Sequence, residues 1–183
     1  MQFPVARPDA EPSFLWWLQN DLLSVAESNL GLRDQSKKIY QPAFDIHGPR
    51  LINTPTFDGA FAQLSPNAAG YWPTAVYELA HETVHLLNPT AANTNWLEEG
   101  IAVAFSVFAL DHYNLSAQRP TSGSYVEALV LVQDLPDGPF PTARRVREVA
   151  GALNAVSYEQ LTDIVPWHDQ SKLRQLATRC VPR

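Results

Sequence analysis

The sequence predicts an α+β fold in which a small antiparallel sheet is followed by two long helices and a helical C-terminal part. Apolar residues recur at helical spacing in residues 14–30 and over most of the chain after residue 71. Between these regions, short runs that favour strands are interrupted by prolines and glycines. Because no linker-like stretch divides the chain, we expect one domain over residues 1–183. Residues 1–70 would hold the N-terminal helix and sheet, and residues 71–183 the remaining helices.

The expected elements follow one another without long gaps. The first helix covers residues 14–30 and ends at Gly31. Strands are expected at 38–40, 50–52 and 57–64. Helix 71–88 has Pro73 in its first turn and Pro89 just beyond its end. The helices expected after it are 95–113, 125–135, 143–153, 158–164 and 170–180.

The composition excludes several classes of protein. With 45% hydrophobic and 17% charged residues the chain is globular, and its net charge of −6 argues against a nucleic-acid partner. Cys180 is the one cysteine of the sequence, so neither an internal disulfide nor a cysteine-based zinc cluster can form. The apolar run 101–110 is too short to span a membrane and indicates a buried core helix. We therefore expect a soluble, cytoplasmic protein without a membrane partner, and the oligomeric state stays open.

The richest basic cluster consists of Arg144, Arg145 and Arg147. We interpret it as the solvated face of a short helix. A phosphate-binding patch is the alternative.

A metal-binding pattern lies within the helix expected at 71–88. His81 and His85 are four residues apart, which places both imidazoles on nearly the same helix face, within reach of one zinc ion. Glu82 follows the first histidine, where its carboxylate can take a proton from a zinc-bound water. The pattern therefore predicts a catalytic zinc site with Glu82 as general base, whereas two surface histidines are the alternative.

A third ligand is expected at the start of the next helix, where two carboxylates compete. Asn95 is a favourable N-cap residue, and Glu98 stands three positions later, as in a capping box. Glu99 is then available for zinc, and Gly100 would let its helix approach the histidine helix closely. The opposite assignment, with Glu98 on zinc, remains open.

The order His-Glu-x-x-His followed by Trp96-Leu-Glu-Glu99-Gly-Ile-Ala resembles the gluzincin metallopeptidases. The resemblance covers about thirty residues. It implies a zincin-like fold, Zn²⁺ held by His81, His85 and Glu99, and a peptide or protein substrate. Two departures stand out: the aminopeptidase motif G-x-M-E-N is absent, and Val103 stands where some gluzincins carry an acidic residue that orients a histidine.

Two further roles are expected from this resemblance. An extended substrate would add to an edge strand at residues 58–64, unless this is an ordinary sheet strand. Tyr125 would donate a hydrogen bond to the oxyanion of the reaction, with Tyr113 and His112 as weaker candidates. Glu78, one turn before Glu82, could line the cleft or be a solvated helix carboxylate.

The sequence thus predicts a zinc-dependent hydrolase that cleaves peptide bonds. Two other classes remain open: a zinc-containing binding or scaffold domain without hydrolytic activity, and a helical interaction protein in which the motif is accidental.

Overall fold

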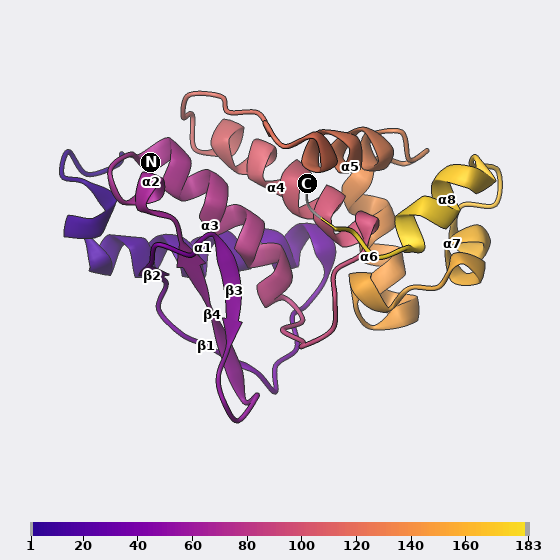
Figure 1. The fold of residues 1–183 in the computed structure, drawn as a ribbon, viewed down its shortest axis with the longest axis horizontal. Helices are drawn as coiled ribbons and strands as arrows, with labels where there is room; N and C mark the ends of the chain where they lie inside the picture. Colours follow the sequence, from indigo (N-terminus) through magenta and orange to yellow (C-terminus); the bar gives the residue numbers. More distant parts are fainter. Residues whose placement is uncertain (1, 182–183) are drawn as a thin grey trace. The chain divides into compact units, whose positions relative to one another are not determined.

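The computed structural model describes residues 2–181, which have mixed α and β structure, in agreement with the predicted class (Figure 1). The chain divides into two compact units. Unit 1 comprises the residues up to Glu27 together with Leu32–Thr90 and Phe105–Arg119. Unit 2 comprises Ser28–Gly31, Ala91–Ala104 and the residues from Pro120 onward. The single domain expected from the sequence, with its division at residue 70, stays a prediction.

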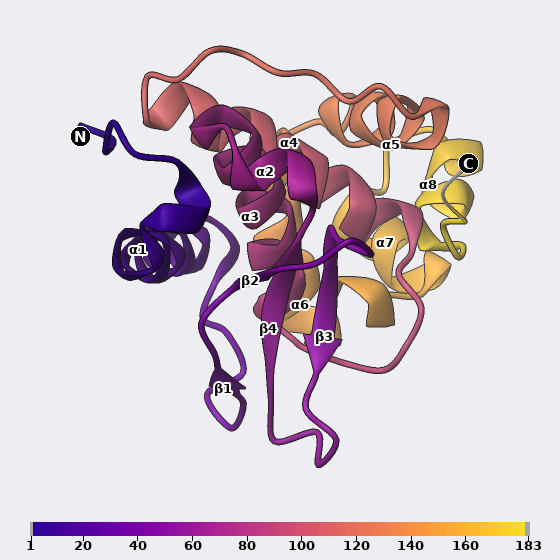
Figure 2. The same ribbon diagram turned by 60° about the vertical axis from the view of Figure 1, so that its left-hand side comes forward.

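Unit 1 contains a four-stranded mixed sheet with β4 (Gly59–Leu64) at its centre (Figure 2). The strands β1 (Lys38–Ile39) and β2 (Ala43–Phe44) pair with β4 in parallel, whereas β3 (Arg50–Asn53) pairs with it antiparallel. The prediction of an antiparallel sheet is therefore wrong for β1 and β2, and the sequence pattern misses β2 altogether. Because β4 has partners along both edges, the edge strand expected at residues 58–64 is also a wrong prediction.

The sheet is covered by α3 (Trp72–Leu86), which packs against β3 and β4 (Figure 1). Alternate residues of β4 are buried, as a strand with one face on a core requires: Ala60, Ala62 and Leu64. Before the sheet come η1 (Pro8–Ala10) and α1 (Pro12–Leu30), and between β4 and α3 lies the short α2 (Pro66–Ala69). Helices predicted at 14–30 and 71–88 are thus confirmed to within two residues at each end.

The helix α4 (Trp96–His112) confirms the prediction of a long helix at 95–113. Its first nine residues, through Ala104, belong to unit 2, and the remainder belongs to unit 1. Apolar residues all around its middle are buried, including Ile101, Val103 and Phe105. This pattern is typical of a core helix. Among the residues described, no helix combines the length and the apolar character that a membrane span requires.

The rest of unit 2 is helical. Its elements are α5 (Gly123–Gln133), α6 (Pro139–Ala150), η2 (Leu153–Ala155), α7 (Tyr158–Ile164) and α8 (Gln170–Ala177). The bounds predicted for α7 are confirmed, and a capping box of Ser157 and Gln160 fixes its start. In contrast, α8 ends three residues before the predicted position, because the chain becomes extended at Thr178.

The basic cluster of α6 is a solvated face only in part, since Arg144 is exposed and Arg145 is half-buried. Arg147 is buried and donates hydrogen bonds from Nη1 to the carbonyl oxygens of Leu30 (2.7 Å) and Gly31 (2.5 Å). Arg144 donates to carbonyls of the preceding two residues of α1, and Arg145 pairs with Asp137. Since the last carbonyls of a helix carry partial negative charge, Arg144 and Arg147 satisfy and stabilise the C-terminus of α1.

Candidate metal centre

His81 and His85 lie on consecutive turns of α3, with ring centroids 5.1 Å apart. The helix forms there because Pro73 starts its first turn and apolar residues such as Val76 and Leu79 are buried at helical spacing. His81 is only 8% exposed, although histidine is a polar side chain. A buried imidazole requires polar partners.

Glu99 lies in the first turn of α4 and is 5% exposed. The predicted N-cap is confirmed, because Asn95 Oδ1 accepts a hydrogen bond from the backbone N–H of Glu98 at 2.8 Å. The same side chain donates from Nδ2 to the carbonyl oxygen of Leu153 at 2.9 Å. Asn95 therefore links the start of α4 to a distant part of unit 2.

The C-terminal segment also holds the start of α4. Trp96 donates its backbone N–H to the carbonyl oxygen of Thr178, and Cys180 donates its own to the carbonyl oxygen of Thr94, both at 3.0 Å. Asn95 and Arg179 form the antiparallel bridge between these two bonds. This pairing explains why α8 stops before residue 178.

Burial, followed by the negative charges of Glu99 and Glu127, raises the pKa of the Cys180 thiol to about 11.

Replacing Asn95 by alanine is expected to lower the free energy of unfolding by about 1–3 kcal/mol, because the N-cap bond and the bond to Leu153 are both lost. Urea unfolding measures this change. Asn20→Ala, on the exposed surface of α1, is the matched control and should change stability by less than about 0.5 kcal/mol. Equal effects of the two substitutions would contradict the anchoring role of Asn95.

Gly100 permits a close approach of α4 to another helix, but this helix is α5 and not the histidine helix that the sequence analysis expected. A Cβ atom at this position would lie 2.5 Å from the carbonyl oxygen of Ala128 and 2.5 Å from Cγ1 of Val132, both in α5. The expectation that Gly100 faces the histidine helix is therefore wrong. Its function is to let α4 and α5 pack closely within unit 2.

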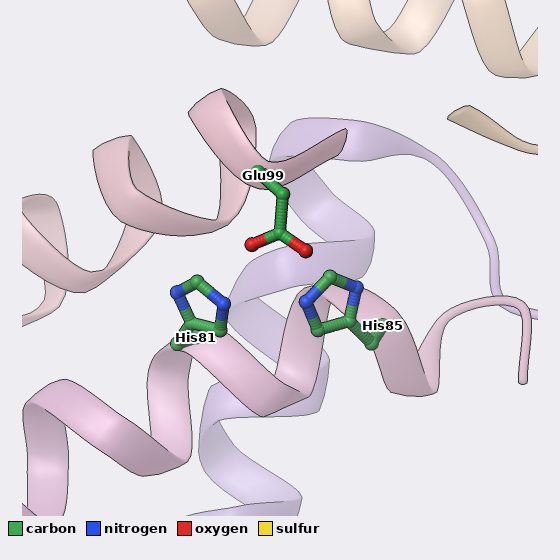
Figure 3. A group of neighbouring side chains, drawn as sticks. All are labelled: His81, His85 and Glu99. Carbon is green, nitrogen blue, oxygen red and sulfur yellow. The ribbon is translucent and has the colours of Figure 1, made fainter. Parts of the chain in front are cut away.

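His81, His85 and Glu99 form a group in which each side chain offers one ligand atom, all within 4.8 Å of one another. The carboxylate of Glu99 points toward the two imidazoles (Figure 3). Two imidazole nitrogens and one carboxylate oxygen match the donor set of catalytic zinc sites, whose bonds measure about 2.0–2.2 Å. The group could hold a metal ion, and its donors suit zinc.

The remaining candidates lie outside this group. Glu82 is buried on α3, directly after His81, at 3% exposure. Tyr125 lies in the first turn of α5 and is half-buried. The hydroxyl of Tyr113 donates to Asp21 Oδ2 at 2.7 Å, while His112 is exposed and stacks on Phe108. Tyr113 thus has a structural partner, and the role expected for Tyr125 stays a prediction.

Glu78 is not the solvated helix carboxylate that the sequence offered as one alternative. Its carboxylate is buried and accepts two hydrogen bonds from Ser65, from the backbone N–H (2.8 Å) and from Oγ (2.5 Å). Ser65 follows the last residue of β4, so Glu78 ties the histidine helix to the end of the central strand. The sequence Ser65-Pro66 could have indicated this contact, because serine followed by proline is a common start of a helix. The backbone N–H of such a serine is then available to a carboxylate from another helix.

Comparison with protein-family models, with curated proteins and with solved structures finds no match for the chain.

Proposed function

We propose that this protein is a zinc-dependent hydrolase of the gluzincin type that cleaves peptide bonds. The observation that carries the proposal is the grouping of His81, His85 and Glu99, drawn from two different helices, around one position. A purely structural explanation does not require a buried glutamate next to the first histidine. Glu82 in that position is what general-base chemistry requires.

The three clustered side chains would hold the metal, and a bound zinc ion would supply a Lewis acid that makes water a better nucleophile at neutral pH. Glu82 would accept a proton from the attacking water as its oxygen bonds to the carbonyl carbon. The same carboxyl group would then deliver that proton to the amine nitrogen as the carbon–nitrogen bond breaks. Tyr125 is our proposed donor to the carbonyl oxygen during this attack.

The sheet offers a place for an extended substrate. Each described strand that flanks β4 pairs with β4 alone, and β3, with four residues, has the longest open edge among them. An extended peptide could add to its open edge through main-chain hydrogen bonds. This edge replaces residues 58–64 in our account of substrate binding.

A zinc-containing binding domain without hydrolytic activity is the second candidate. One observation favours it: Val103 is fully buried among apolar residues, at the position where some gluzincins keep an acidic residue that orients a ligand histidine. Such an orienting partner commonly contributes to metal affinity and activity.

Turnover of a peptide library separates the two candidates. The zinc-loaded protein is incubated with mixed peptides, and new termini are identified by mass spectrometry, with chelator-treated protein as the control. Cleavage at defined bonds that disappears with chelator supports the hydrolase. Zinc binding of full stoichiometry without any cleavage would instead support the binding domain.

A further inference from the structure

Unit 2 contains a pocket of about 610 Å³ beside the start of α4. Its walls come from α4, from α5 and from the C-terminal segment that pairs with residues 94–96. The lining residues are Trp96, Gly123, Ser124, Glu127, Arg179 and Val181. A volume of this size suits a small molecule or one to two residues of a peptide.

Two opposite charges line the pocket without neutralising each other. Arg179 is exposed, and within residues 2–181 its guanidinium has no ion pair or hydrogen bond. Glu127 accepts a hydrogen bond from Gln175 Nε2 at 2.6 Å and has no cationic partner in the same part of the chain. The pocket thus offers a donor fork for a carboxylate and a separate acceptor for an N–H group.

The pocket also presents apolar surface. The indole of Trp96 is half-buried, and Val181 is 57% exposed although it is apolar. Pockets that bind ligands commonly combine such apolar walls with a few polar groups that fix orientation.

The pocket lies close to the candidate metal ligand in unit 2. Trp96 precedes Glu99 by three residues on the same helix, a rise of roughly 4.5 Å. Because residues three apart in a helix are neighbours on its surface, the pocket residue Trp96 and the candidate ligand Glu99 lie on the same side of α4.

We propose that this pocket binds the carboxyl-terminal residue of a peptide. The α-carboxylate binds Arg179, the terminal side chain is apolar and packs on Trp96 and Val181, and a backbone N–H donates to Glu127. This inference rests on the proposed function and specifies its substrate class: peptides with a free carboxyl terminus, cleaved near that end.

The test compares two fluorescein-labelled pentapeptides, Gly-Gly-Ala-Ala-Leu with a free C-terminus and the same peptide as a C-terminal amide. Binding to the full-length Glu82→Gln protein is measured by fluorescence anisotropy, once with zinc and once after chelation. We expect the free acid to bind about ten-fold or more tightly than the amide in both states, because a charge-assisted contact is lost in the amide. Arg179→Gln should reduce this ratio to about one.

Arg174→Gln is the matched control, since Arg174 is an exposed arginine of the same unit that stacks on Tyr158. It should leave the preference for the free acid unchanged. Equal binding of the two peptides, no binding of either, or a preference that survives Arg179→Gln would each overturn the inference. A preference present only with zinc would assign the carboxylate to the metal and overturn it as well. Since chelated protein is included, this result does not depend on hydrolysis or on metal binding.

Discussion

Replacing Glu82 by glutamine is expected to lower peptide turnover by about 10²–10⁴-fold while zinc remains bound. Glutamine has nearly the same shape as glutamate, but its amide cannot take up the proton of the attacking water. The side chain is buried on α3 and is not part of the ligand group, so the metal site itself should persist. The turnover number on a cleaved library peptide and the zinc content are measured on the same preparation.

The matched control is Glu148→Gln, which changes an exposed carboxylate of α6 in the same way. It should retain wild-type turnover and zinc content. If Glu82→Gln also retained wild-type turnover, Glu82 would not be the general base. If it lost zinc together with activity, the residue would have to be reassigned as part of the metal site.

Zinc is expected to stabilise the folded protein by about 2.7 kcal/mol at a free concentration one hundred times its dissociation constant. The ligands His81 and His85 come from α3 and Glu99 from α4, so an unfolded chain does not present them together. Thermal unfolding with increasing free zinc measures the effect. His85→Ala should abolish this stabilisation, since only two of the three protein ligands remain in the variant.

His47→Ala is the control for this titration, because His47 lies in an exposed turn that is not part of the ligand group. This variant should respond to zinc as the wild type does. A zinc-dependent shift that persists in His85→Ala would point to adventitious binding elsewhere on the chain.

The helices of the metal site could be predicted because their signals are local. Pro73 and Pro89 bracket the histidine helix, and Asn95 caps the next one with a bond to a residue three positions away. The same capping argument assigned Glu98 to the N-cap and Glu99 to the metal, and the ligand group contains Glu99. A spacing of four residues was sufficient to place the two histidines on one helix face.

The sheet could not be predicted to the same extent, because pairing joins residues that are distant in sequence. β1 and β2 have only two residues each, too few to show an alternation that would reveal their direction. Their parallel pairing with β4 depends on the path of the chain segments that connect β1 and β2 to β4. The length of a strand segment thus limits what its sequence can reveal.

Long-range polar contacts account for the other differences. Glu78 is buried because Ser65, at the end of β4, supplies both of its donors. Arg147 is buried because the last carbonyls of α1 lie beside α6. The helix predicted through residue 180 ends early because the C-terminal segment pairs with the residues before α4. In each case the partner lies outside the local sequence window.

The zinc content of the purified protein, measured by elemental mass spectrometry beside His81→Ala and Glu99→Ala, tests the central claim most directly. Our account predicts about one zinc ion per chain in the wild type and its loss in both variants, because a site with three protein ligands loses one of them in each. Absence of zinc from the wild type, even after reconstitution, would contradict the account and make the motif accidental. Full zinc content in Glu99→Ala would show that the metal is held by other residues.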